Sequence, residues 1–562
     1  MTNNKAMETQ RQRYALYLVL VYVLVYLLPL GAKPVIIPDE ARYAEIPREM
    51  LISGNWVSPH LNGLRYFEKP ALGYWATAVS LKLFGENAFA MRLPSALAAG
   101  LSAFAIFLLL RRFSSNTSTA LPGAMAYLTM LGVFLIGTIN ILDSLFSFLL
   151  TAAFASFYFA HREQDAGTRL NWLLLLGAFC GAAFLSKGFL AFVLLGIVIV
   201  PFVIWEGRWR ELFSRGWIPV LAALAVVAPW AIMIHIQEPE YWHYFIWEEH
   251  IKRFAAEDAQ HSEPFWYYLA FLPLLATPWI FLLPSAIQGI RRSSQDTSFT
   301  RYVLLWLLLP LLFFSLSRGK LPTYILPCLA PLAILIVLGV HQAVVNGHVR
   351  MYKAGAWIGA ILFVLFALAI VLIQTGAIGK VIWYEDETWK WSGLVLAFSI
   401  GAVMLWLSTR AEAPLHKLSL YGASLIVVMI SLNYVIPTRT AQSKMPGEFL
   451  QQQAAHLTPD TILLSDDIMI HAVNWFYKRT DVYMTGAGES KHGLSFADAK
   501  GVLIEGEALK QFIEQNAGQI PIAVIHHSDA YDKMVRIMPQ DSQLQRWGKF
   551  VMWIIPVAPA VE

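Results

Sequence analysis

Long apolar stretches separated by short polar loops make up most of this 562-residue chain. Because a bilayer core of roughly 30 Å needs about 20 apolar residues per helix, these stretches predict about thirteen transmembrane helices. The apolar residues 71–84 predict a helix that lies along the membrane surface or dips into it, not a further span. The predicted spans cover residues 14–31, 88–110, 119–138, 141–160, 170–186, 188–206, 217–236, 265–288, 302–317, 321–342, 354–373, 392–409 and 417–436.

The charges of the loops predict how these spans are oriented. With the N-terminus in the cytoplasm, every cytoplasmic loop carries arginine or lysine, as the positive-inside rule requires. An odd number of spans then places the C-terminal end outside. The basic residues of the cytoplasmic loops are Arg111, Arg112, Arg162, Arg169, Arg208, Arg210, Arg215, Arg291, Arg292, Arg301, Arg350, Lys353, Arg410 and Lys417.

The pattern changes near Pro437, where the chain becomes mixed polar. Short β-branched runs alternate there with helical stretches, which is typical of a small α/β domain. The predicted fold is an all-α polytopic membrane domain followed by an α/β domain outside the membrane. The predicted boundaries are 1–436 for the membrane domain, with external loops at 32–87 and 237–264, and 437–562 for the α/β domain.

Composition agrees with a polytopic membrane protein. The chain is 57% hydrophobic and only 14% charged, and its 20 Trp and 22 Tyr suit many membrane interfaces. The net charge of +4 comes with no basic run suited to nucleic acid. Cys180 and Cys328 both lie in apolar runs, so we expect small core residues there, not a disulfide or a metal pair.

Ionisable residues are concentrated in the first external loop. Such groups are costly to desolvate at a membrane face, so their presence predicts one wall of an active site. Asp39 and Glu40 could instead cap a helix, and Glu68 with Lys69 could form a surface ion pair. Function is the favoured interpretation for Asp39, Glu68 and Lys69. The charged residues of the run from Pro38 to Trp75 include Asp39, Glu40, Arg42, Glu45, Arg48, Arg65, Glu68 and Lys69.

Further candidates lie near the external ends of later helices. Cations there predict a pocket for an anionic group, and phosphate is the usual partner of arginine and lysine. Asp143 could also cap a helix, and Lys187 could extend its ammonium to the interface. We expect His526 and His527 to be exposed and inert. The candidates are Asp143, Lys187, His250, Arg253, Arg318, Lys320 and Tyr324.

Several long motifs resemble one enzyme family. They are PDEARYAEIPREML, GLRYFEKPALGYW, WHYFIWEEHIKRFAAEDAQH with FWYY, SRGKLPTYILP and MTGAGESKHGLSFADAKG. They are similar to those of the lipid A 4-amino-4-deoxy-L-arabinose transferases, which are integral membrane glycosyltransferases of the GT-C class, related to protein O-mannosyltransferases. The resemblance implies about thirteen transmembrane helices and a periplasmic α/β domain in a bacterial inner membrane.

The resemblance also implies the reaction. The donor would be an amino sugar linked to undecaprenyl phosphate, the acceptor a lipid A phosphate, and the outcome resistance to polymyxin and other cationic peptides. A phosphate monoester has a second pKa near 6, so the acceptor is anionic at neutral pH. The main task is therefore to neutralise crowded phosphates, which is electrostatic preorganisation.

The candidate residues then receive roles. Asp39 occupies the position of the family's key acidic residue after the first span. Glu68 and His250 could hold a divalent ion such as zinc, because carboxylate and imidazole are zinc ligands. Further candidates are Glu40, Arg42 and Lys187. We expect Asp39, Asp143 and Glu68 to be catalytic, and Lys69, Arg253, Arg318, Lys320 and Tyr324 to bind the donor phosphate.

Two other functions stay compatible with the residues. An enzyme using the same kind of carrier could move another sugar to protein or glycan, and it would leave the mass of lipid A unchanged. A transporter for a lipid or an anion is the other possibility. It is disfavoured because the charged residues gather at one membrane face instead of the midplane, and no inverted repeat is visible.

Overall fold

The computed structural model describes residues 2–252, 262–292 and 296–557, and only the backbone of residues 2–11 and 250. The chain forms two compact units. The helical unit comprises Met1–Leu30, Arg92–Val381 and Thr388–Val435, and the mixed unit comprises Gly31–Met91, Ile382–Glu387 and Ile436–Glu562. The first external loop therefore shares a compact unit with the C-terminal residues, although the two are far apart in sequence.

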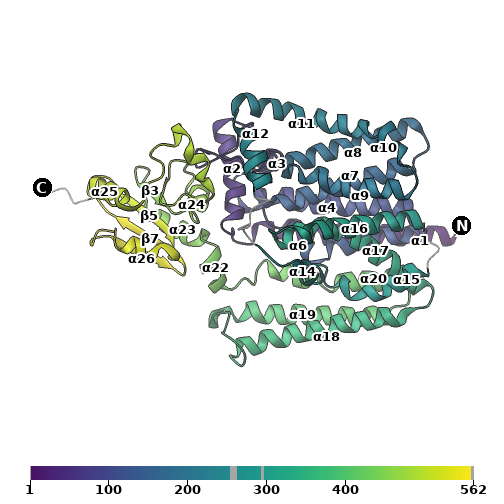
Figure 1. Ribbon diagram of the computed structural model, residues 1–562. Coiled ribbons are helices and arrows are strands. Elements are labelled where there is room, and N and C mark those ends of the chain that lie inside the picture. Colours follow the sequence, from purple (N-terminus) through teal and green to yellow (C-terminus); the bar gives the residue numbers. More distant parts are fainter. Residues whose placement is uncertain (1, 253–261, 293–295, 558–562) are drawn as a thin grey trace. The chain divides into compact units, whose positions relative to one another are not determined.

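Long helices run side by side through the helical unit (Figure 1). The long helices are α1 (Thr2–Tyr22), α4 (Ala88–Phe113), α7 (Leu142–Arg162), α8 (Ala166–Lys187), α9 (Leu190–Trp205), α11 (Trp217–Gln237), α16 (Thr297–Leu316), α17 (Leu326–Val345), α18 (Val349–Gln374) and α19 (Thr388–Arg410). The shorter helices include α5 (Ala120–Leu128), α6 (Leu131–Gly137), α10 (Arg210–Ser214), α12 (Tyr241–His243), α14 (Tyr267–Leu275), α15 (Leu283–Arg291), α20 (Pro414–Ala423) and α21 (Ile426–Leu432).

Among the described residues, ten helices are long and apolar enough to cross a membrane, or twelve if each of two bent helix pairs is one span. The bent pairs are Thr117–Leu128 with Leu131–Gly137, at 60°, and Tyr267–Leu275 with Trp279–Arg291, at 97°. Helix α9, with 16 residues, is not one of these ten, and it coincides with the predicted span 188–206. Each predicted span thus coincides with a helix or a bent pair. The polytopic helical fold is confirmed, and the count of thirteen crossings stays a prediction.

Buried hydroxyl and indole groups tie distant helices of this unit together. Tyr26 donates from its hydroxyl to the Leu128 carbonyl at 2.6 Å, and Tyr302 donates to the Phe154 carbonyl at 2.7 Å. The Trp279 indole donates to the Thr129 hydroxyl at 2.9 Å. Burying an unpaired polar group in an apolar surrounding costs free energy, and these hydrogen bonds avoid that cost. They also fix the positions of the helices relative to one another.

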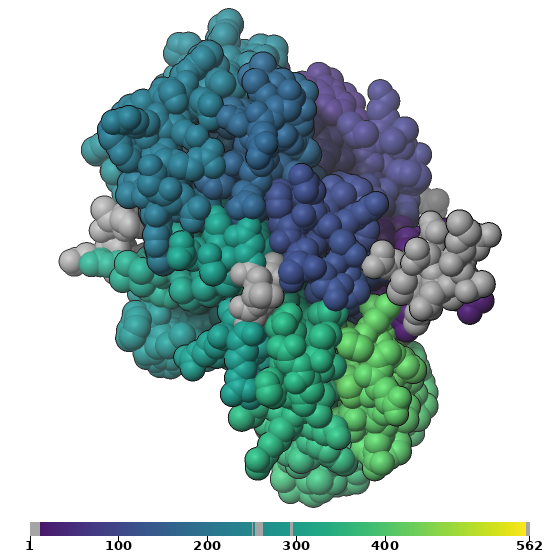
Figure 2. All heavy atoms as spheres, turned by 90° about the vertical axis from the view of Figure 1, so that its right-hand side faces the viewer, coloured from purple at the N-terminus to yellow at the C-terminus, as the bar shows by residue number. Residues whose placement is uncertain are grey.

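The two ends of the helical unit differ in which loops they carry. The N-terminus lies at one end with α10 and α15, and α6, α12 and α14 lie toward the other (Figure 1). Figure 2 views the N-terminal end directly. The basic residues around α10 and after α15 therefore share the end predicted to face the cytoplasm.

The mixed unit is built on a five-stranded sheet with the order β4-β3-β5-β7-β6. Strand β3 pairs in parallel with β4 and β5, and β7 pairs antiparallel with β5 and β6. The predicted α/β character of the C-terminal residues is confirmed. The strands are β3 (Ile462–Ser465), β4 (Tyr483–Met484), β5 (Ile522–His527), β6 (Gln543–Trp547) and β7 (Phe550–Ile555), and the helices include α22 (Thr438–Lys444), α23 (Gly447–Gln453), α24 (Ile470–Tyr477), α25 (Gly506–Asn516) and α26 (Tyr531–Val535).

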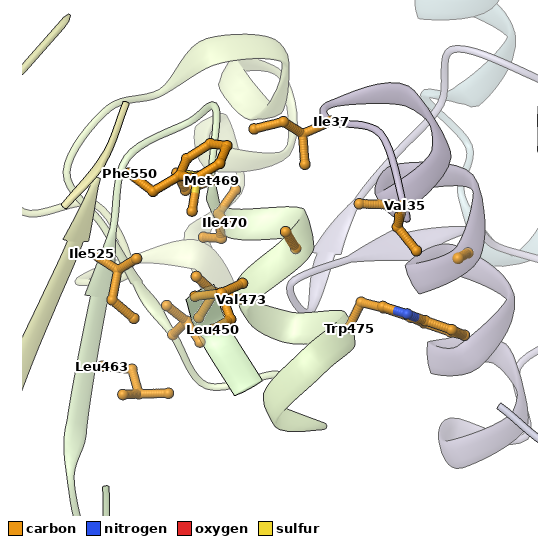
Figure 3. Close-up of a cluster of buried hydrophobic side chains, with 14 of the residues drawn as sticks. Val35, Ile37, Leu450, Leu463, Met469, Ile470, Val473, Trp475, Ile525 and Phe550 are labelled. Carbon is orange, nitrogen blue, oxygen red and sulfur yellow. The ribbon is translucent and has the colours of Figure 1, made fainter. Parts of the chain in front are cut away.

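Apolar residues of the first loop join the hydrophobic core on one side of this sheet. Val35 and Ile37 are buried in the same cluster as Ile470 and Val473 of α24 and Ile525 of β5 (Figure 3). Helices α25 and α26 cover the other face. All residues of β5 and β7 are consequently buried, as expected for strands covered on both sides.

The first loop contributes two helices and a hairpin to the mixed unit. They are α2 (Asp39–Ser53), α3 (Leu72–Phe84), β1 (His60–Leu61) and β2 (Leu64–Arg65). Helix α3 coincides with the predicted surface helix at 71–84. With 13 residues it is too short to cross roughly 30 Å of hydrocarbon.

The expectation that His526 and His527 are exposed is wrong. Both lie at the end of the central strand β5, and both are buried. The Trp553 indole donates to His526 Nε2 at 3.1 Å, and His526 Nδ1 lies 2.8 Å from the His527 carbonyl. The backbone N–H of His527 donates to Asp466 at 2.6 Å. Burial lowers the pKa of His526, so it packs as a neutral, hydrogen-bonded ring.

Candidate active site

The start of α2 holds a cation between two acids. The buried Arg42 guanidinium pairs with Asp39 one turn earlier and with Glu489, which follows β4. Burial opposes the charge on Arg42, but Tyr66, the nearby carboxylates and a second tyrosine together hold its pKa above the ordinary value. Arg42 therefore stays cationic. The Asp39 side chain is 58% exposed, so its carboxylate is open to a ligand.

Glu68 and Lys69 belong to the same unit. Lys69 Nζ donates to the backbone carbonyl of Glu68 at 3.0 Å, and the Glu68 carboxylate acts electrostatically on Arg42. The structure thus brings Asp39, Arg42 and Glu68 together, with Lys69 next to Glu68. Glu40 differs from these residues, because it is buried and accepts a hydrogen bond from Ile36 N at 3.0 Å. This contact favours its structural interpretation, at the turn into α2.

A second charged group lies deeper along α2. Arg48 binds Glu45 through two hydrogen bonds of 2.8 and 2.6 Å. Glu49 accepts hydrogen bonds from the backbone N–H groups of Asn62, at 2.5 Å, and Gly63, at 3.0 Å, in the β1–β2 turn. Burial, with the charge of Glu45, raises the pKa of Glu49 to about 8. Two acids share one arginine here, and the surplus negative charge is avoided by holding a proton.

This proton predicts a pH-dependent stability. The folded chain binds the Glu49 proton more tightly than the unfolded chain, whose pKa is the ordinary 4.5. The free energy of unfolding should therefore fall as the pH rises from 4.5 through about 8. Glu49→Gln is neutral at every pH and should flatten this dependence.

Thermal unfolding of the full-length protein in detergent, followed from about pH 5 to about pH 9, measures the effect. Glu514→Gln, at an exposed position of α25, is the control and should follow the wild type. Parallel pH profiles for the wild type and Glu49→Gln would contradict the assignment.

In the helical unit, Asp143 and Lys187 form an ion pair. Asp143 lies in the first turn of α7 and Lys187 ends α8, and their Oδ1 and Nζ atoms are 2.8 Å apart. Both side chains are largely buried, with 13% and 12% exposed. Lys187 Nζ also lies 5.0 Å from the centroid of the Tyr324 ring. The structure therefore brings together three of the predicted site residues.

The turn after α16 is held by a lysine. Lys320 is buried, and its ammonium donates to the backbone carbonyls of Glu263, at 2.7 Å, and Ser317. Burial lowers the pKa of Lys320. Arg318 is exposed in the same turn, and its carbonyl accepts from Glu263 N at 3.3 Å. In this geometry Lys320 fixes the turn that carries Arg318, and phosphate binding by either residue stays a prediction.

Two predicted residues fall outside what the structure describes. Arg253 lies outside the described residues, and so does the side chain of His250, whose backbone belongs to the π-helix Tyr244–Lys252. In the described part of the chain, no group of three or more His, Cys, Asp and Glu could hold a metal ion. Zinc binding by Glu68 and His250 stays a prediction.

Three residues near the first loop were not identified from the sequence. Glu489 pairs with Arg42, and Asp498 pairs with Arg65 at 2.5 Å. Burial and the charge of Arg42 lower the pKa of His471 to about 3, so this ring is neutral. Glu489 and Asp498 lie in the motif MTGAGESKHGLSFADAKG. The resemblance singled out that motif without assigning it a role, and this was the only signal for them.

Comparisons with known proteins agree with this organisation. The family model described as dolichyl-phosphate-mannose-protein mannosyltransferase matches residues 13–245, and the one described as arabinosyl transferase ArnT, C-terminal domain, matches residues 441–554. A solved structure of ArnT from Cupriavidus metallidurans bound to undecaprenyl phosphate has a TM-score of 0.82 at 23% identity. The match covers 97% of this chain and 99% of that one, and the two share a fold.

Curated relatives match along the whole chain. Several of them are named undecaprenyl phosphate-alpha-4-amino-4-deoxy-L-arabinose arabinosyl transferase. The relative from Shewanella sediminis is 40% identical over 97% of this chain and 98% of its own length. Those from Erwinia tasmaniensis and Photorhabdus laumondii are 38% and 35% identical, and cover 97% and 100% of this chain and 99% and 100% of their own lengths.

Proposed function

The chain belongs to the family of undecaprenyl phosphate-alpha-4-amino-4-deoxy-L-arabinose arabinosyl transferases, and we propose that it moves this amino sugar from undecaprenyl phosphate to a phosphate of lipid A. It is a glycosyltransferase with many membrane-spanning helices. The supporting observation is full-length similarity to relatives that carry this name. The proposed consequence is resistance to polymyxin and other cationic peptides.

The proposed location is the bacterial inner membrane, with the first loop, the reaction site and residues 437–562 on the periplasmic side. Support comes from the loop charges, because basic residues follow the positive-inside rule when the N-terminus is cytoplasmic. The lipid-linked donor and lipid A are the proposed partners, together with the surrounding membrane lipids.

The reaction exchanges one phosphate for another at the sugar. An oxygen of the acceptor phosphate forms a bond to the anomeric carbon, and the bond from that carbon to the carrier phosphate breaks. The carrier phosphate leaves with the electron pair. Because both phosphates are anionic, fixed cations that neutralise the departing group contribute most to the rate.

The residues keep the roles predicted from the sequence. Lys69, Arg253, Arg318, Lys320 and Tyr324 would bind the donor phosphate. Asp39, Asp143 and Glu68 would be catalytic, and the exposed carboxylate of Asp39 is suited to orient the acceptor or to bind the ammonium of the sugar. A divalent ion such as zinc on Glu68 and His250 would supply further positive charge.

Mass spectrometry of lipid A from cells with and without the chain tests the proposal. We expect a mass increase of one aminopentose residue on lipid A, and a higher polymyxin concentration for growth inhibition, only when the chain and its donor are present. Cells that carry Asp39→Ala are the matched control. Unchanged lipid A, with labelled sugar on protein instead, would favour a transferase for another acceptor.

A further inference from the structure

Helices α18 and α19 form an antiparallel hairpin at one side of the helical unit. The pair lies along the lower edge in Figure 1 and again in Figure 2. Gly359 of α18 packs against Leu405 of α19, where an added Cβ would come within 3.1 Å of a leucine methyl group. Apolar residues such as Trp357 and Val364 are exposed on the outer face of the hairpin.

That outer face has an apolar hollow of about 330 Å³. Trp357, Ile361 and Val364 of α18 and Val403 and Trp406 of α19 line it. The three α18 residues are spaced by four and three positions, so they share one face of the helix. All five side chains are at least one third exposed, with values from 37% to 54%. The hollow is thus accessible to an alkyl chain from the bilayer.

Basic residues lie beyond one end of the hollow, on the same helix faces that line it. Arg350 and Lys353 precede Trp357 by seven and four positions, and therefore continue its helix face. On α19, Arg410 comes four positions after Trp406, and its guanidinium lies 5.3 Å from the centroid of that indole ring. Both helices therefore place positive charge beyond the same end of the hollow.

A buried lysine strengthens this positive end. Lys417 of α20 is 5% exposed, and its ammonium lies 5.5 Å from the ring of Tyr352. Lys353 acts on Lys417 as a like charge, and Glu412 acts on it as an opposite charge. Arg350 and Arg410 add exposed positive charge at this end, to which an anionic headgroup would be attracted.

Basic residues at helix ends are common in membrane proteins, and often they only extend their charged ends to the membrane–water interface. Arg111 and Arg112 of α4 show this ordinary case. Their guanidinium groups lie 5.9 Å from the Phe107 ring and 5.7 Å from the Phe113 ring, respectively. The hairpin differs because a hollow for an acyl chain continues directly from its cations.

We propose that the α18–α19 hairpin is a binding site for an anionic glycerophospholipid. One acyl chain fills the hollow between Trp357 and Trp406, and the headgroup phosphate binds Arg410 and Lys353. On the predicted orientation this lipid comes from the cytoplasmic leaflet. The site does not depend on the proposed transferase function.

The test uses the full-length protein, delipidated in mild detergent and titrated with dioleoylphosphatidylglycerol or dioleoylphosphatidylcholine. Native mass spectrometry counts the bound lipid. The wild type should retain phosphatidylglycerol and discriminate against phosphatidylcholine. Lys353→Gln with Arg410→Gln should weaken phosphatidylglycerol binding by at least about tenfold, because each removed cation costs about 1 kcal/mol near a phosphate.

Two further variants separate the hollow from general surface charge. Ile361→Trp fills the hollow at an exposed position and should weaken binding as strongly, with all cations in place. Arg111→Gln with Arg112→Gln removes the same charge from α4 and should change binding less than about twofold. Equal binding of both phospholipids, unchanged binding in Ile361→Trp, or equal loss in the α4 variant would overturn the proposal.

Discussion

Replacing Lys69 by alanine is expected to lower the transfer of the amino sugar to lipid A by on the order of 10²–10³-fold. The ammonium would neutralise the carrier phosphate as it leaves, and removing one preorganised charge of this kind has an effect of that size. Asp39→Ala is expected to act as strongly, because it removes the carboxylate that Arg42 holds at the start of α2. Both losses should appear in kcat/KM.

An assay with purified protein, donor and lipid A, read by mass spectrometry, measures the loss. Lys491→Ala is the matched control, since Lys491 is an exposed lysine of the same unit. The control and both variants should be expressed and should unfold like the wild type. Full activity of Lys69→Ala and Asp39→Ala would show that these residues of the first loop take no part in the reaction.

The membrane helices could be predicted because lipid imposes a simple rule on sequence. Every spanning backbone must satisfy its hydrogen bonds within a long apolar helix, so length and hydropathy mark each span. Length and hydropathy did not predict the breaks inside two of the spans. In each, a change of direction occurs without a charged residue, at Thr129–Met130 and at Ala276–Pro278.

The candidate site was predictable only where its parts are close in sequence. Asp39 and Arg42 are three positions apart on a helix, which places them on one face. Arg65 and Asp498 are 433 positions apart, and no local pattern links them. For the same reason, the sequence did not predict the shared core, in which Val35 and Ile37 belong to one cluster with apolar residues of the C-terminal strands and helices.

The buried histidines show a second limit. His526 and His527 are polar and adjacent, which in a strand usually exposes one of the two. Both are buried because helices cover both faces of the sheet, and Trp553, from another strand, supplies a hydrogen-bond partner for the His526 ring. A buried polar group is acceptable once it is paired, and the partner is invisible in the local sequence.

The largest expected effect on stability comes from breaking the Asp143–Lys187 pair. Asp143→Ala leaves the buried Lys187 ammonium without its carboxylate, and removing one partner of such a pair costs about 3–5 kcal/mol. Lys187→Met should destabilise in the same way. The double variant Asp143→Leu with Lys187→Met should regain most of the loss, because no isolated charge is left in an apolar surrounding.

The purified protein is unfolded in mixed detergent micelles by increasing the share of denaturing detergent. This gives the free energy of unfolding of each single variant and of the double variant, relative to the wild type. Arg301→Gln, which breaks the more exposed pair with Glu206, is the control and should cost less than about 1 kcal/mol. Additive losses in the double variant would show that the two residues stabilise the fold independently. Activity then separates the two interpretations of Asp143. A double variant that regains stability but not transfer would support its predicted catalytic role, and one that regains both would leave Asp143 a structural partner of Lys187.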